Sequence, residues 1–480
     1  MSSRATMHKV LVKISRLPSS HSGQTRRTPI APELRIVRGE TIAIFALLCV
    51  QFVPSIGPAL SMGALTLWAL QSSKAAMQAL SLGVLLIFLN RSIFPVTADV
   101  QTLKWFLLAV SALKVYRSVS RPKKPAHWLP ALTLFMLVCT IITIFSSSNV
   151  LISAFKLGSF GFAVYAVLLG LRDRTVPSAY WLDWFYTLHV VVVTASIPFL
   201  FTSAGHSINS ALFQGILNHS QALGIYLAPT AMLLSSSIFV NRVRLFPAFV
   251  VAVTWYLIYA SGCRTAVFAV SLSVMITALS ALFRGDLAHI VKRTKAMQCG
   301  IVVAFCIPLV LIPFGDRVVQ SVLHFSAKSS AVGESIDFES ATDTATNSRA
   351  SQIAKARAAF TEHPFTGVGF GLGSEDLMGG IKTSNTFGLP VSAPTEAGFI
   401  HVAAPMQIGV FGTACFLILL VALFRPILRF ASIPVILFAV TAFSVNFGEM
   451  IIFSVGGLGL HMWMVIACAY EHSVRRQSGE

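Results

Sequence analysis

The sequence predicts an all-α integral membrane protein that crosses the bilayer many times. Of its 480 residues, 55% are hydrophobic and 11% are charged, and the mean hydropathy is +0.75. In an average soluble domain, roughly a quarter of the residues are charged. Apolar runs that could cross a hydrocarbon core of about 30 Å, which takes roughly 20 helical residues, recur along most of the chain. The composition and these runs exclude an ordinary soluble domain.

The chain begins and ends in predicted cytoplasmic tails. Residues 1–40 carry eight basic side chains, several Ser and Pro, and no sustained apolar periodicity. We expect this tail to be mostly disordered and able to touch anionic lipid. A cleavable signal peptide is not predicted, because the first apolar run follows a long basic leader and continues into further runs. Residues 471–480 form the short second tail.

Fourteen apolar runs are candidate spans, and two short ones, 61–73 and 103–116, leave twelve spans as an alternative. A first transmembrane bundle is predicted over 41–314 and the last helices over 399–470. The runs in order are 41–59, 61–73, 76–93, 103–116, 128–146, 150–171, 182–203, 220–239, 245–262, 265–283, 297–314, 399–424, 431–447 and 450–470.

The net charge of +18 follows the loops and does not indicate nucleic-acid binding. Lys and Arg gather in short segments between alternate runs, which is the pattern of cytoplasmic loops in membrane proteins. With the N-terminus inside, all these basic loops and both termini fall on the cytoplasmic side. The clearest of these residues are Arg117, Arg121, Lys123, Lys124, Arg172, Arg174, Arg242, Arg244, Arg284, Lys292, Arg293, Lys295, Arg425 and Arg429.

The long segment 315–398 is then predicted to lie outside the cytoplasm, which is the periplasm if the cell is a diderm bacterium. It holds nine of the 18 acidic residues, and loops of this length are either functional or disordered. Its Ser/Thr/Asp-rich part, 327–346, is expected to be flexible. The part that follows has helical spacing.

A helix is predicted over 348–362, with Asn347 or Ser348 as its N-cap. Helical spacing puts Ile353, Ala356 and Phe360 on one face, and Pro364 and Gly367 stop the helix. We expect an amphipathic helix on the outer membrane surface, followed by a tight turn. Ala359 extends the apolar face, and Arg349, Lys355, Arg357 and Glu362 lie elsewhere.

Gly367-Val-Gly-Phe-Gly371, which continues to Gly373, is not predicted to bind a nucleotide. No parallel-strand pattern precedes it and no Walker lysine follows it. A sharp turn that lets the backbone approach a headgroup or a neighbouring helix fits these glycines better. The seven cysteines form no Cys-x-x-Cys pair, and we interpret them as small membrane-core residues and not as metal ligands.

Arg264 lies at the predicted outer junction of two runs. It is either an interfacial anchor that snorkels to the headgroups or a ligand of an anion. Guanidinium groups bind phosphate oxygens in bidentate fashion and stay charged. If Arg264 and Arg349 converge at the bilayer edge, they form a clamp for a diphosphate.

The motifs around these arginines resemble those of the O-antigen ligase and polysaccharide polymerase superfamily. Arg349, about fifteen residues and then Pro364-x-x-Gly367-x-Gly369 match its most specific pattern, and Ser261-Gly-Cys-Arg264-Thr resembles a second element. Weaker similarities lie at 215–224, at 395–412 and at 446–463, so that the resemblance covers roughly 210–470.

The resemblance implies a glycosyl transfer outside the cytoplasm, with a polyprenyl-diphosphate-linked oligosaccharide as donor and no metal, cofactor or nucleotide sugar. It implies that Arg264 and Arg349 bind the donor diphosphate. Arg357 is a weaker helper, for which a solvated helix charge is the alternative. A flippase and chain-length regulator proteins are the implied partners, with the bilayer itself.

The loop exit departs from the ligase pattern. Ligases usually have a His-Asn pair there, whereas this chain has Thr395-Glu396-Ala-Gly and a later His401. A carboxylate or an imidazole can remove the proton of an acceptor hydroxyl, so Glu396 and His401 remain alternative bases. The missing pair favours a polymerase over a ligase.

Three further polar residues lie in or near apolar runs. Lys156 is an intramembrane cation, which is a functional candidate unless it snorkels. His219 lies in the similar 215–224 element, although a hydrogen-bonded helix-end histidine is the commoner role. Glu449 falls at the predicted outer turn between the last two runs and is expected to face the same cavity as Arg264.

These features predict a polymerase that joins lipid-linked saccharide repeat units at the outer face of a bacterial inner membrane. A ligase that transfers finished polymer to a lipid A core is the alternative within the class. A lipid-linked saccharide flippase or transporter is the alternative from another class, and it should show charged residues or broken helices near the midplane.

Overall fold

The protein is an all-α polytopic membrane protein. The structure, a computed structural model, describes residues 32–54, 56–94, 98–118, 126–207, 212–240, 244–284, 350–372 and 399–479. Within these ranges it has fourteen α-helices and no β-strand. The predicted run 297–314 and the tail before residue 32 lie outside the described residues.

The helices follow the predicted runs closely. Their bounds are α2 (Arg38–Val50), α3 (Gly57–Ala69), α4 (Ser73–Ile87), α5 (Ala98–Ser118), α6 (Trp128–Ser146), α7 (Val150–Gly170), α8 (Ser178–Ser196), α9 (Ser220–Val240), α10 (Leu245–Ala260), α11 (Arg264–Arg284), α16 (Ala350–Glu362), α17 (Ile400–Phe430), α18 (Ile433–Ser444) and α19 (Leu458–Gln477), with short 3-10 helices η1 (Ile197–Phe201), η2 (Ser203–Gly205) and η5 (Val445–Phe447).

Two predicted runs differ most from the helices, each for a local reason. Within the first run, 41–59, α2 ends at Val50, because Pro54 lacks an N–H and disfavours helix in the residue before it. The last run, 450–470, is shifted to 458–477. The side-chain oxygen of Asn446 accepts hydrogen bonds from the N–H groups of Ile451 and Ile452 at 2.9 and 2.8 Å, so these residues form a capped turn instead of a helix.

The exposed surfaces of the outer helices are apolar, as expected for helices that face the lipid of a bilayer. In the described part of the chain, six helices are long and apolar enough to cross a membrane: α6, α7, α8 with η1, α9, α11 and α17. Helix α9 is almost wholly enclosed by the others, whereas α6 and α11 leave most of their apolar residues uncovered. Large side chains such as Phe145, Leu151 and Phe283 are more than 79% exposed. An apolar surface of this extent requires lipid or protein to cover it.

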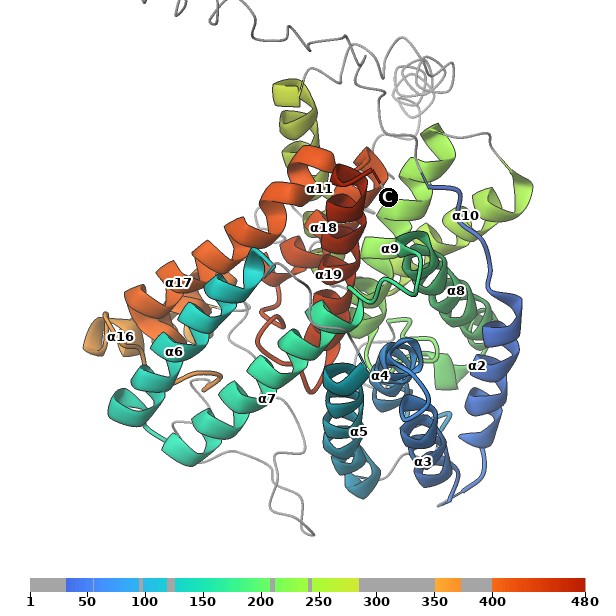
Figure 1. Ribbon diagram of the computed structural model, residues 1–480. Helices are drawn as coiled ribbons and strands as arrows, with labels where there is room; N and C mark the ends of the chain where they lie inside the picture. The colour runs from blue at the N-terminus through green and yellow to red at the C-terminus, as the bar shows by residue number, and fades with distance from the viewer. Residues whose placement is uncertain are drawn as a thin grey trace, which may run out of the picture.

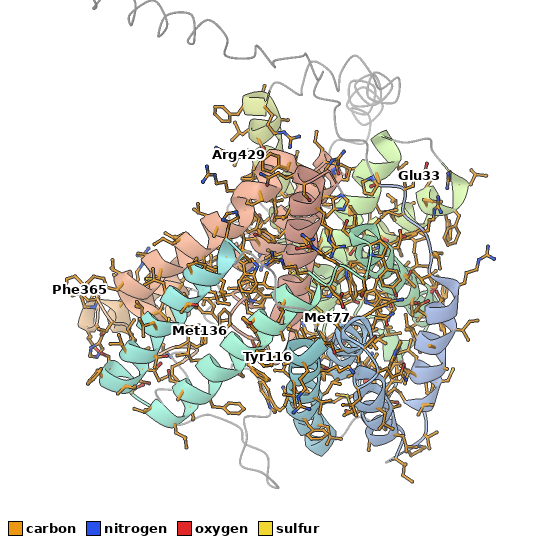
Figure 2. The ribbon with its side chains drawn as sticks, in the orientation of Figure 1. Glu33, Met77, Tyr116, Met136, Phe365 and Arg429 are labelled. Atoms are coloured by element: carbon orange, nitrogen blue, oxygen red, sulfur yellow. The ribbon has the colours of Figure 1, made fainter. Side chains whose placement is uncertain are left out.

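The helices form one bundle with a protruding corner (Figure 1). Helices α18 and α19 run through its middle, α6 and α17 lie side by side at its left edge, and α16 packs against the outer end of α17. Figure 2 labels Arg429 near one end of α17 and Phe365 near the other. The long helix α17 therefore connects two opposite ends of the bundle.

The contacts between helix ends described below lie at one or the other of two ends of the bundle. Successive spans are predicted to cross the membrane in alternating directions, so their ends should lie alternately on its two sides. At one end, called here the arginine end, Arg284 donates to the carbonyls of Leu428 and Ala431, and Arg475 lies against the 173–176 turn. At the other end, called here the site end, Asn90 bonds Gly215 and Asn218 bonds Phe88. Segments predicted to share a membrane side are in contact.

A buried ion pair within α19 is hydrogen-bonded to the turn before α8 at the arginine end. The guanidinium of Arg475 donates to Glu471 at 2.8 Å, to the Val176 carbonyl at 2.6 Å and to the Asp173 carbonyl at 2.8 Å. Both charged residues are less than 9% exposed. Each nitrogen of the guanidinium donates to an acceptor, and such additional hydrogen bonds are the condition under which a buried ion pair is tolerated.

We predict that Arg475→Met lowers the free energy of unfolding by about 3–5 kcal/mol, because it leaves the Glu471 carboxylate and two carbonyls buried without a donor. Thermal or denaturant unfolding in detergent measures this change. Arg476→Met is the matched control, since the neighbouring side chain is only half-buried, and it should cost less than about 1 kcal/mol. Equal effects of the two substitutions would contradict the prediction.

Candidate functional site

The glycine-rich turn completes a broken helix. Helix α17 is interrupted at Gly409, where φ is 60° and ψ is −173°. In an unbroken helix, Val410 and Phe411 would donate to the carbonyls of Met406 and Gln407. Here Val410 and Phe411 donate instead to the carbonyls of Pro364 and Phe365, at 2.9 and 3.5 Å.

The two carbonyls freed by the break are also satisfied. The N–H of Val368 donates to the Met406 carbonyl at 2.9 Å, and the N–H of Gly369 donates to the Gln407 carbonyl at 3.0 Å. Unsatisfied backbone groups are costly within a membrane protein. The turn and the break are therefore two halves of one structure. Of the two roles predicted for these glycines, the structure supports approach to a neighbouring helix.

Phe370 anchors the turn in the bundle core. Its side chain is fully buried, and its ring centroid lies 5.0 Å from that of Phe453 and 5.2 Å from that of Phe160. Phe135 and Phe416 belong to the same aromatic cluster. Burial of a ring of this size opposes any displacement of the turn.

Lys156 and Gln407 hold the end of the turn at Gly371. The amino group of Lys156, on α7, donates to the Gly371 carbonyl at 2.5 Å. The side-chain oxygen of Gln407 accepts from the Gly371 N–H at 3.2 Å. The cation predicted to be either functional or snorkelling thus has a protein partner, and it positions the glycine-rich segment.

Helix α16 is present where the sequence predicts it, but its apolar face meets protein. Ala356 and Ala359 are buried against Val368, Leu372 and Met406. This differs from the expected contact with the membrane surface. The physical reason is that a face of small alanine side chains lets α16 pack closely on α17 and on its own turn. Arg357 projects from the opposite side and is exposed.

Arg264, Glu449 and His401 come from three segments that meet at the site end. Arg264 is the first residue of α11 and is half-buried. A Cβ on Gly448, the residue before Glu449, would lie 2.6 Å from the Thr265 side chain, so the 448–449 turn touches the start of α11. The ring of His401, near the start of α17, faces that of Phe447 at 6.3 Å.

The three segments in contact carry a cation, a carboxylate and an imidazole. Arg264 and Glu449 are half-buried and His401 is exposed. A guanidinium at the start of a helix adds its charge to the positive end of the helix dipole, so Arg264 can bind an anion. The imidazole of His401 is a group that can accept a proton.

His219 has a structural partner at the start of α9. Its Nδ1 accepts a hydrogen bond from the Gln221 N–H at 3.1 Å, which is the helix-end role given as its commoner interpretation. The Gln221 carbonyl in turn accepts from the Cys263 thiol at 3.5 Å. Through Cys263, the residue before Arg264, this histidine is tied to the start of α11.

Two predicted site residues lie outside the described residues: Arg349 and Glu396. The proposed convergence of Arg349 with Arg264, and the choice between Glu396 and His401 as base, therefore remain predictions. The N-cap residues of α16, Asn347 and Ser348, also lie outside them.

The sequence interpretation missed Gln407, Lys104 and Trp105. Gln407 is 3% exposed and Lys104 is 9% exposed, and both lie inside predicted apolar runs. A polar residue in such a run is itself a signal, because burying it in a membrane protein is costly without a partner or a function. The same reasoning that selected Lys156 could have selected both.

No protein-family model matches the chain, and no curated protein is similar to it.

Proposed function

We propose that the protein is a glycosyltransferase that polymerises saccharide repeat units carried on a polyprenyl diphosphate, at the outer face of a bacterial inner membrane. The proposal rests on the motif resemblance of Arg264, Arg349 and the glycine-rich turn. The observation that supports it most is the contact, at one end of a membrane bundle, between the segments that carry Arg264, Glu449 and His401.

In the proposed orientation the arginine end is cytoplasmic and the site end is periplasmic. Arg172, Arg284, Arg425 and Arg429 belong to segments at the arginine end, and cytoplasmic loops are the ones enriched in Lys and Arg. Both termini are then cytoplasmic. A lipid-linked substrate would reach Arg264 from the bilayer without passing through water.

The proposed reaction needs an anion site and a base. The hydroxyl oxygen of an incoming repeat unit attacks the anomeric carbon of the chain, whose bond to the diphosphate oxygen breaks. The electron pair leaves on the diphosphate, where Arg264 and Arg349 stabilise the growing negative charge. The hydroxyl proton passes to His401 or Glu396. The sugars are redistributed and no external reagent is consumed.

Purified protein incubated with a polyprenyl-diphosphate oligosaccharide tests this proposal. Products should lengthen in whole repeat units with no nucleotide sugar present. Elongation that occurs only when a nucleotide sugar is added would contradict the donor assignment. No product under either condition, from protein that is folded by thermal unfolding, would contradict the reaction.

Deletion of the gene separates the polymerase from the ligase alternative. A cell without a polymerase retains single repeat units on its surface lipid, whereas a cell without a ligase accumulates long polymer on the carrier lipid. We expect single repeat units. Glu396, in place of the usual His-Asn pair, favours this outcome.

A transporter is the second candidate function, and two observations bear on it. His189 and His461 are buried inside the bundle, and α17 is broken, as transporter helices often are. The backbone groups freed at that break, however, are already bonded to the glycine-rich turn and do not face a midplane cavity. Flipping of a fluorescent lipid diphosphate in proteoliposomes, without elongation, would favour this alternative.

A further inference from the structure

The exposed apolar face of α17 begins at the break in that helix. Residues 402–409 are buried or half-buried, whereas every exposed residue from 410 to 421 is apolar. These exposed residues follow helical spacing along the outside of the bundle, as they do in a helix that presents one face to its surroundings. The large ones are Val410, Phe411, Leu417, Ile418 and Val421, which are between 48% and 64% exposed.

Two arginines mark where this apolar face ends. Arg425 and Arg429 follow Val421 on the same side of α17 and are exposed, and arginines at the end of a span extend to the headgroups. At 1.5 Å per residue, Phe411 lies about 27 Å from Arg429 along the helix. The hydrocarbon core is about 30 Å thick. Phe411 therefore lies near the opposite edge of the core, at the site end.

Phe365 adds a second ring at this edge. The N–H of Phe411 donates to the Phe365 carbonyl at 3.5 Å, and the two rings stack with their centroids 5.8 Å apart. Phe365 is 60% exposed, although residues 367–370 of the same turn are buried. Figure 2 shows Phe365 at the protruding corner, far along α17 from Arg429. The bonds across the break thus build one exposed aromatic surface from two segments.

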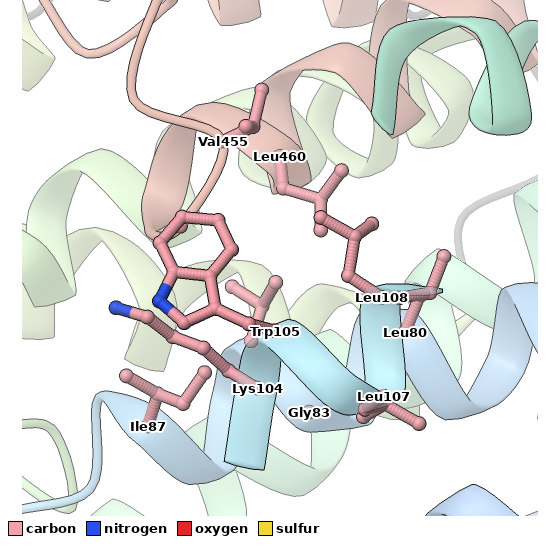
Figure 3. A pocket seen from close by; sticks show the side chains of 11 residues that line it. Leu80, Gly83, Ile87, Lys104, Trp105, Leu107, Leu108, Val455 and Leu460 are labelled. Atoms are coloured by element: carbon pink, nitrogen blue, oxygen red, sulfur yellow. The ribbon is translucent and has the colours of Figure 1, made fainter. Parts of the chain in front are cut away.

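The recess between α4, α5 and the chain that leads into α19 offers no comparable surface (Figure 3). Lys104, Trp105 and Leu460 are among the side chains that line it. Its volume is about 20 Å³, which holds about one water molecule. A lipid chain cannot enter this recess, whereas it can cover Phe365 and Phe411 from outside.

Lipid is the occupant that fits the aromatic surface. The surface continues the apolar face of α17, which is one of the helices long and apolar enough to cross a membrane. A saccharide also stacks on aromatic rings, but its hydroxyl groups need polar partners, and Val410 and Pro364 flank the two rings. We propose that Phe365 and Phe411 insert among the acyl chains just below the headgroups of the leaflet at the site end, and so hold the glycine-rich turn at the level of the headgroups.

This insertion replaces the membrane contact expected of α16. Ala356 and Ala359 meet protein, so the apolar face of α16 is not available to lipid. The bonds across the break fix Phe365 to α17, so the depth of the two rings sets the depth of the glycine-rich turn. The inference does not rest on the proposed glycosyl transfer, and its test needs no enzymatic activity.

Photo-cross-linking of the full chain in liposomes of a single phospholipid tests the inference. p-Benzoylphenylalanine takes the place of Phe365 or of Phe411, and the larger ring should leave the fold intact because both positions are exposed. After illumination, each protein should gain the mass of one phospholipid. Fragmentation of the adduct should place the new bond on acyl carbons near the glycerol, because both rings are expected just below the headgroups.

Two other positions are the controls. The same photoreactive residue at Leu417 lies deeper along α17, so its bond should lie nearer the ends of the acyl chains. At Gln477, which is exposed in the last turn of α19, it should give no lipid adduct. Adducts at Leu417 with none at 365 or 411 would overturn the lipid contact, and bonds at the chain ends from 365 and 411 would overturn the depth. Cross-links to a second copy of the chain, or to an oligosaccharide added to the liposomes, in place of lipid would overturn the choice of occupant.

Discussion

Arg264→Ala is expected to reduce chain elongation on the order of 100-fold, the usual scale for losing one donor that stabilises a developing anion. The proposed leaving group is a diphosphate, and Arg264 begins α11 beside the 448–449 turn. Initial rates of elongation on a lipid-diphosphate oligosaccharide, measured with purified protein, check the expectation. The unfolding temperature should change little, because Arg264 is only half-buried.

Arg264→Lys separates a diphosphate clamp from an interfacial anchor. A lysine snorkels as well as an arginine but cannot bind phosphate oxygens in bidentate fashion. If Arg264 clamps the diphosphate, Arg264→Lys should therefore lose most of the rate of chain elongation. If Arg264 is only an interfacial anchor, the rate should hardly change. Arg429→Ala, at the opposite end of the bundle (Figure 2), is the control and should retain full activity. Full activity in both Arg264 variants would contradict the mechanism.

The positions of the helices could be predicted because each depends on a local pattern. Apolar runs of sufficient length locate α6, α7 and α11 almost to the residue, and Pro364 and Gly367 mark the end of α16. The alternation of basic loops also predicts which helix ends lie together. These signals all lie within the segments that they describe.

The partners of these segments could not be predicted in the same way. An apolar face such as that of Ala356 and Ala359 looks the same whether it meets lipid or protein. The break at Gly409 is hidden in a continuous apolar run, because the residues that satisfy it lie some 40 positions earlier in the chain. Lys156 was recognised as unusual, but its acceptor at Gly371 is more than 200 residues away.

Gly409→Ala is expected to lower the free energy of unfolding of the region where the glycine-rich turn joins α17 by about 3 kcal/mol or more. At φ 60° and ψ −173° a residue with a side chain is strained by about 1–3 kcal/mol. In addition, the new Cβ would lie 2.2 Å from the Phe365 carbonyl oxygen and 2.5 Å from the Thr366 nitrogen. Both are backbone atoms, and neither can turn aside without breaking the bonds that join the turn to α17.

Hydrogen exchange with mass spectrometry and thermal unfolding in detergent measure this effect together. The amides of Val368, Gly369, Val410 and Phe411 should lose protection first, because they form the bonds across the break. Gly158→Ala is the matched control: Gly158 lies within α7 with nothing within 4 Å of a new Cβ, and alanine there should stabilise the helix by about 0.5–1 kcal/mol. The two substitutions should thus change the stability of the protein in opposite directions. Full protection of these amides in Gly409→Ala would contradict the prediction. The glycine-rich turn would then be held beside Lys156 by something other than its bonds to α17.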